Sequence, residues 1–105
     1  MNFPPVDFEA SSHDFTFLTN HTHVLVAIAK TPDIRMRDIA AEVGITERAV
    51  QRIVEDLSAI GYLTIIKDGR RNLYEIQADR PLMHPLSRHR KIGDLIRLIF
   101  PEFKD

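Results

Sequence analysis

Apolar residues recur at helical spacing in three separate stretches of the chain. The first stretch runs from about residue 21 to residue 30, and its apolar positions are Val24, Leu25, Ile28 and Ala29. Asn20 can cap the start of this helix, and Pro32 follows its end. Because the stretch is apolar over most of its surface, we expect the helix to be buried.

The second stretch contains two helices separated by a single glycine. A brief helix from about Asp38 should end at Gly44, since glycine tolerates the left-handed conformation of many helix ends. Thr46 can cap a second helix, over residues 46 to 60, which Gly61 ends. The apolar side of this second helix carries Val50, Ile53, Val54, Leu57 and Ile60, and its opposite side carries Glu47, Arg48, Gln51, Arg52 and Glu55.

A β-hairpin is predicted over residues 62 to 77. Its sequence, "YLTIIKDGRRNLYEI", has β-branched and aromatic residues on both sides of an Asp-Gly pair, which is a strong turn signal. Lys67, Arg70 and Arg71 flank the turn, so the tip of the hairpin should be basic.

The third helical stretch closes the chain. Pro81 and Pro85 indicate a linker before it, and Ser87 can cap its start. Its apolar stripe comprises Ile92, Leu95, Ile96, Ile99 and Phe103, with Leu98 and Phe100 outside the stripe. The stripe either closes the core of the same domain or meets a second copy of the chain, and Gly93 could permit a close approach within the domain.

The order of these elements predicts a winged helix-turn-helix fold, of the α+β class and mainly α. We expect a flexible arm at residues 1–14, a DNA-binding domain at residues 15–80, and a linker with a C-terminal helix at residues 81–105. Paired recognition helices need an interface, which favours a symmetric dimer through the last helix. The predicted dimer residues are Ile92, Leu95, Ile96, Ile99, Phe100 and Phe103.

The basic face of the helix over residues 46–60 and the basic hairpin tip together favour DNA binding. Arginine can fork onto guanine and glutamine onto adenine in the major groove, while the hairpin reaches an adjacent groove or the phosphates. Taken singly, each of these charges could be an ordinary solvated side chain, and the prediction depends on their joint order along the chain. The predicted DNA contacts are Thr46, Glu47, Arg48, Gln51, Arg52, Lys67, Arg70, Arg71 and Asn72.

Composition narrows the class of protein further. The 105 residues and 44% apolar content fit one packed domain, and the lack of cysteine excludes disulfides, thiolate metal sites and thiol nucleophiles. Neither a leader peptide nor a membrane span is evident, so we expect a cytoplasmic protein. The net charge is −1, yet residues 30–97 hold 13 basic against 10 acidic side chains.

Metal binding and catalysis are not favoured. His21 and His23 lie two positions apart in a predicted helix, where their side chains diverge. No Gly-rich phosphate loop, nucleophile motif or acid pair stands out, and Asp38 and Glu42 are more simply read as a solvent face. We expect no catalytic residue, no metal site and no cofactor.

The stretch "IRMRDIAAEVGITERAVQRIVEDLSAIGYLTIIKDGRRNLYEI" resembles the winged-helix domain of MarR- and ArsR-like transcription regulators. The flanking "TFLTNHTHVLVAIA" and "HPLSRHRKIGDLIRLI" are similar to small one-domain regulators near MarR, so the likeness spans about residues 15–100. The resemblance implies a homodimeric repressor or activator on double-stranded DNA, with residues 46–60 as recognition helix and residues 62–77 as wing. Unlike full-length MarR proteins, the chain lacks the long flanking helices that form their dimer interface and ligand pocket.

Two other functions remain open at this point. Winged helices are reused for protein–protein contact without nucleic acid, and the near-neutral total charge is compatible with such an interaction module. RNA binding is less favoured, since exposed aromatic residues for base stacking are not evident around the basic side chains.

Overall fold

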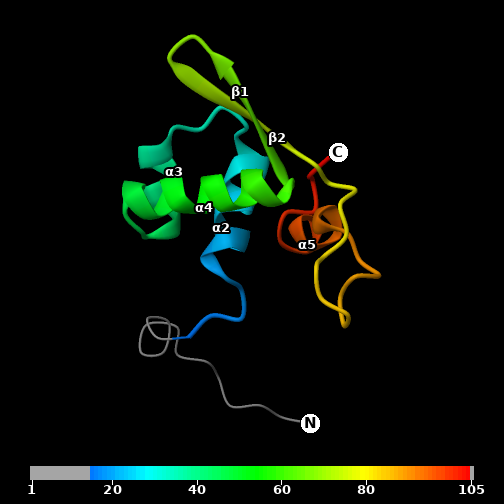
Figure 1. Cartoon of the computed structure of the whole chain (residues 1–105). Coiled ribbons are helices and arrows are strands. Elements are labelled where there is room, and N and C mark those ends of the chain that lie inside the picture. The colour runs from blue at the N-terminus through cyan, green and yellow to red at the C-terminus, as the bar shows by residue number, and fades with distance from the viewer. Residues whose placement is uncertain (1–14, 105) are drawn as a thin grey trace.

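The computed structural model describes residues 15–104, and the predicted arm at residues 1–14 lies outside this range. Three helices are followed by a two-stranded wing and a last helix (Figure 1), which confirms the winged helix-turn-helix class. The elements are α2 (Asn20–Lys30), α3 (Met36–Val43), α4 (Glu47–Ile60), β1 (Leu63–Asp68), β2 (Arg71–Ile76) and α5 (Ile92–Ile99).

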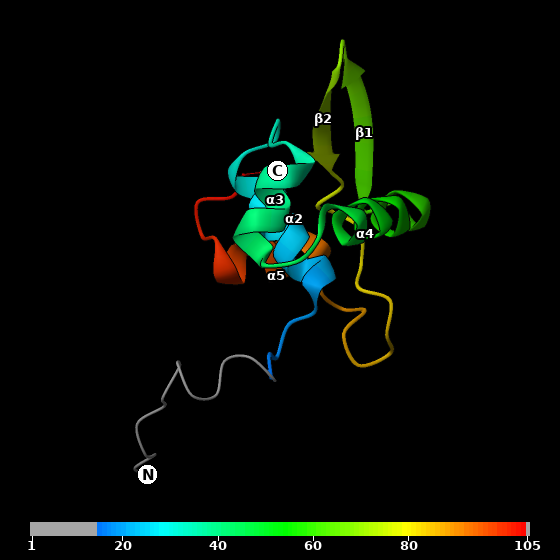
Figure 2. The same ribbon diagram turned by 90° about the vertical axis from the view of Figure 1, so that its left-hand side faces the viewer.

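Helix α2 is the centre of the core. It contacts α3, α4, α5 and strand β2, and the side chains of Val24 and Ile28 are fully buried. Figure 2 shows α2 between α3, α4 and α5. A helix that is apolar over most of its surface must be covered on several sides, and the surrounding elements provide that cover.

The start of α2 differs by one residue from the prediction. Thr19, not Asn20, is the N-cap: its backbone is extended, and its hydroxyl accepts a hydrogen bond from the backbone N–H of Thr22 at 3.3 Å. Asn20 already lies within the helix. Both residue types favour N-caps, so composition alone did not separate them.

The turn between α3 and α4 forms as predicted. Gly44 adopts the left-handed conformation with φ of +83°, and its N–H donates to the carbonyl of Ala40 at 2.8 Å. The hydroxyl of Thr46 then accepts from the N–H of Ala49 at 3.0 Å, which caps α4. At its far end α4 stops at Gly61, also left-handed.

The wing is an antiparallel pair closed by a two-residue turn. Asp68 pairs with Arg71, so Gly69 and Arg70 make the turn. Gly69 has φ of +63°, and a left-handed glycine in the first of two turn positions is typical of a type II′ hairpin. The N–H of Tyr74 donates to the carbonyl of Pro32 at 2.9 Å, which ties β2 to the chain after α2.

The last helix begins later than predicted. Ser87 does not cap it: its N–H donates to the carbonyl of His84 at 2.9 Å within a run of turns, and α5 starts at Ile92. The N–H of Lys91 donates to the carboxylate of Asp94 at 2.9 Å. This bond, together with Arg97, holds the pKa of Asp94 below its ordinary value of 3.8.

Helix α5 packs on the core of its own domain. Ile92 and Ile96 are buried against it, and Leu95 packs partly there. The outer side of the helix remains exposed at Leu98 (77%) and Ile99 (39%). For Ile92 and Ile96 the structure therefore agrees with the alternative that this helix closes the core of its own domain. A partner could reach these two side chains only if the core opened. Within residues 15–104, no helix is long and apolar enough to cross a membrane.

Candidate nucleic-acid interface

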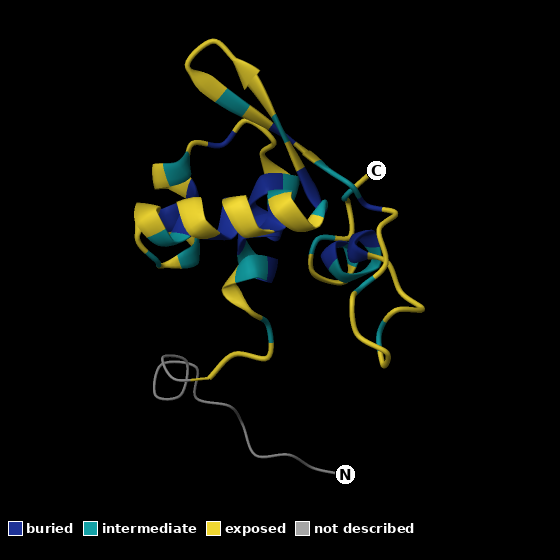
Figure 3. Cartoon of the chain, in the orientation of Figure 1, coloured by how far each residue is buried: buried dark blue, intermediate teal, exposed yellow. Residues whose placement is uncertain are grey.

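The first half of α4 presents its polar residues to solvent. Val50, Ile53, Val54 and Leu57 are buried beneath the helix. Exposed residues lie along its outer side (Figure 3). They include Thr46, Glu47, Arg48, Gln51 and Arg52, which the sequence singled out as DNA contacts.

Charge is unevenly distributed along α4. The first half holds Arg48 and Arg52 against the single carboxylate of Glu47, whereas the second half holds Glu55 and Asp56. Asp56 is engaged by His21, whose Nε2 lies 3.0 Å from its carboxylate. Because DNA phosphates repel carboxylates, this polarity favours an approach of the N-terminal half to DNA.

Hydrogen bonding already involves one of the predicted base-reading side chains. The amide nitrogen of Gln51 donates to the carboxylate of Glu55 one turn later, at 3.5 Å. Such a long, exposed contact is weak, so the amide can exchange it for a base edge.

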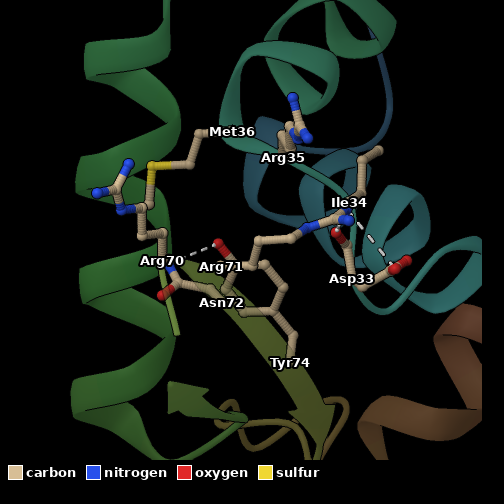
Figure 4. Close-up of a pocket in the computed structure, with 8 residues that line it drawn as sticks. All are labelled: Asp33, Ile34, Arg35, Met36, Arg70, Arg71, Asn72 and Tyr74. Atoms are coloured by element: carbon tan, nitrogen blue, oxygen red, sulfur yellow. Dashed lines mark hydrogen bonds and ion pairs between the residues drawn. The ribbon is translucent and has the colours of Figure 1, made fainter. Parts of the chain in front are cut away.

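The predicted wing residues fall into two groups. Lys67 and Arg70 are exposed near the tip. Arg71 instead reaches back to the turn after α2, where its Nη2 donates to the carbonyl of Asp33 at 2.9 Å and lies 3.6 Å from the Asp33 carboxylate (Figure 4). Arg71 therefore connects the wing to the body of the domain, while half of its side chain stays exposed.

Asn72 is less exposed than the other predicted wing contacts. Its side chain is only partly exposed, and its Nδ2 donates to the hydroxyl of Tyr74 at 3.3 Å. Its Oδ1 is buried and has no hydrogen-bond partner within residues 15–104. Asn72 therefore lies opposite Lys67 in the wing, but it presents less of its side chain to solvent than Lys67 and Arg70 do.

Sequence reasoning missed Asp33 and Arg35, which lie beside the wing in space. They come from the turn between α2 and α3, nearly 40 positions before Arg71. The basic pair in "IRMR" was a local signal for Arg35. For Asp33 no local pattern pointed to the wing.

The histidines of the first helix are used in polar contacts. His21 faces Asp56, and Nδ1 of His23 lies 3.3 Å from the side-chain oxygen of Asn20. The part of the chain that the structure describes holds no group of three His, Cys, Asp or Glu residues placed to bind a metal.

Solved structures of other transcription regulators share this fold, and three of them are MepR, PcaV and AntR. MepR, a transcription regulator of the Staphylococcus aureus multidrug efflux pump MepA, matches with a TM-score of 0.53 and 17% identity, over 91% of this chain and 65% of MepR. The PcaV transcriptional regulator from Streptomyces coelicolor, solved with its natural ligand, matches with a TM-score of 0.51 and 17% identity, over 97% and 86% of the two chains. The antimony-specific transcriptional repressor AntR matches with a TM-score of 0.51 and 18% identity, over 92% and 93%.

The family is established by sequence. No curated protein matches the chain significantly. The model of the MarR family matches residues 13–71, which is more than half of the chain. The MarR resemblance is thereby confirmed, and with it the expectation of a regulator rather than an enzyme. The chain belongs to the MarR family of DNA-binding transcription regulators.

Proposed function

We propose that this regulator binds a pseudo-palindromic DNA site as a homodimer in the cytoplasm. The first half of α4 enters the major groove, and the wing lies on the flanking groove or backbone. The observation that carries the proposal is the exposed basic start of α4, on a helix that lies along the same edge of the domain as the wing. Figure 2 shows β1 rising from the end of α4 at one edge of the domain.

The residue types at the start of α4 suit base recognition. Arg48 and Arg52 lie one turn apart and line the same shallow groove beside the helix. A guanidinium can bind guanine through two parallel hydrogen bonds, and each good pair of this kind contributes about 1–3 kcal/mol of discrimination. The buried side of α4 fixes the helix, so these side chains are presented on a rigid support.

The dimer would form around the outer side of α5. Leu98 and Ile99 are exposed there, and Phe100 is half-buried. Because Ile92 and Ile96 belong to the core of their own domain, the contact would rest on this outer rim rather than on the whole stripe. A two-fold axis through it would pair two recognition helices for two half-sites.

Band-shift titrations over a salt series test the proposal. We expect the region upstream of the chain's own gene to bind far more tightly than a random duplex of equal length, with affinity falling as salt rises. Equal competition by the two duplexes would remove the claim of specificity. Absence of binding to either would favour a protein-interaction module instead.

Two variants test the division of labour between helix and wing. Arg52→Ala should lose discrimination at one base step, by about 1–3 kcal/mol, while keeping non-specific affinity almost unchanged. Arg71→Ala should weaken all sequences alike, because it removes one positive charge from the wing and breaks the contact that holds the wing to Asp33. Binding of single-base variants of the site would be measured for both proteins. Equal, sequence-independent losses would contradict the assignment.

A further inference from the structure

A pocket of about 300 Å³ lies between the turn after α2 and the wing. It brings together three residues of the turn, the first residue of α3 and four residues of the wing, whose side chains Figure 4 draws. The residues are Asp33, Ile34, Arg35, Met36, Arg70, Arg71, Asn72 and Tyr74. Of these, Ile34 and Tyr74 are buried and form an apolar base.

Positive charge dominates the pocket. Three guanidinium groups, those of Arg35, Arg70 and Arg71, line it against the single carboxylate of Asp33. Asp33 is paired with Arg71. The side chains of Arg35 and Arg70 are exposed and make no hydrogen bond or ion pair within residues 15–104.

The remaining donors match one class of ligand. Arg71 contacts Asp33 through Nη2, whereas a guanidinium carries five N–H donors in a fixed fork. Arginine forks bind phosphate and similar oxyanions with two parallel hydrogen bonds. The pocket holds one carboxylate, that of Asp33, which is already paired with Arg71, and its other side-chain acceptors are the Asn72 amide oxygen and the Tyr74 hydroxyl. Positive groups therefore outnumber negative ones around the space, which favours a compact anionic group.

We propose that this pocket binds a phosphate-type oxyanion between Arg35 of the turn and Arg70 of the wing. The oxyanion would be a backbone phosphate of DNA, in which case the inference rests on the proposed function, or a free phosphate-type anion. In either case the ligand would add a link between two elements that Arg71, the N–H of Tyr74 and the packing of Ile34 and Tyr74 in one core already join. Occupancy therefore fixes the wing against the body of the domain.

The experiment compares wild type with Arg35→Gln and with Arg88→Gln as matched control. Arg88 is also an exposed arginine, but it lies in the loop before α5, away from the pocket. Both substitutions remove one charge, so a difference between them reports position rather than net charge. Thermal melts of all three proteins verify that each is folded.

The first arm titrates inorganic phosphate into DNA-free protein at constant ionic strength, followed by the backbone amide NMR signals. We expect saturable shifts around residues 34–36 and 70–72 in wild type and Arg88→Gln, and their loss in Arg35→Gln. The second arm measures the salt dependence of DNA binding. There Arg35→Gln should lower the slope by about 1 and weaken all sequences about fivefold near 0.15 M salt, whereas Arg88→Gln should not.

The two arms separate the sources of the anion. If Arg35→Gln changes the salt dependence of DNA binding but phosphate causes no NMR shifts, the site binds the DNA backbone. If phosphate causes the NMR shifts but Arg35→Gln leaves the salt dependence unchanged, the site binds a free anion. If phosphate causes the NMR shifts but the protein binds no DNA, the proposed function is wrong and the proposed anion site in the pocket is still supported. If Arg35→Gln matches Arg88→Gln in both arms, the proposal is overturned.

Discussion

At the scale of single residues, one glycine sets the geometry on which the interface depends. Gly44 ends α3 with φ of +83°, so the chain can turn sharply before Thr46 starts α4. A Cβ added at Gly44 would meet no atom within 4 Å. Glycine is therefore required here for its backbone conformation, and not because neighbouring atoms would crowd a side chain.

The need for a left-handed backbone at Gly44 predicts the outcome of two substitutions there. Gly44→Ala should lower the free energy of unfolding by about 1–2 kcal/mol, because an L-residue with a Cβ is strained in the left-handed region. Gly44→Asn should cost clearly less, since asparagine visits that region more readily. Urea denaturation of both variants measures the difference. Equal losses would mean that something other than backbone conformation is needed at this turn.

At the scale of elements, the position of α5 depends on a close approach to the linker. The N–H of Gly93 donates to the carbonyl of Ala78 at 3.0 Å. A Cβ at Gly93 would lie 3.0 Å from both that carbonyl oxygen and the Cβ of Ala78. Glycine here weakens the helix locally but lets its first turn pack directly on the chain that leaves the wing.

Helix propensity and packing therefore make opposite predictions for Gly93→Ala. Propensity alone would stabilise the helix by about 1 kcal/mol. Overpacking against the backbone of Ala78 costs about 1–3 kcal/mol, and we expect it to prevail, so the variant should melt at a lower temperature than wild type. Adding Ala78→Gly should recover part of the loss, since it removes one of the two close contacts with Ala78. A more stable single variant would show that α5 can shift at no cost.

At the scale of the whole molecule, the domain leaves apolar residues exposed on α5 after its own core is complete. Leu98 is 77% exposed although Ile96, two positions earlier, is fully buried. Leu86, in the loop before α5, is exposed to a similar extent at 82%. Of these two leucines, only Leu98 lies on the helix that we propose as the dimer contact.

Sedimentation of two variants tests the dimer. We expect wild type to be dimeric, Leu98→Asp to be monomeric, and Leu86→Asp to remain dimeric, because a carboxylate cannot be buried in an apolar contact without a partner. The monomer should keep the melting temperature expected for an intact core and lose affinity for a two-half-site duplex. A monomeric wild type would mean that no such dimer forms. A dimer that survives Leu98→Asp would mean that the contact lies elsewhere on the protein.

The sequence by itself determined the helices around the helix-turn-helix, the left-handed stop at Gly44, the cap at Thr46 and the wing, because periodicity and turn chemistry are local properties. It did not determine that Arg71 turns back to Asp33 or that Ile92 and Ile96 complete the domain's own core. Those outcomes depend on which surfaces meet across long stretches of chain. A basic or apolar side chain can face solvent, contact a partner or pack in the core, and only the tertiary structure decides among these.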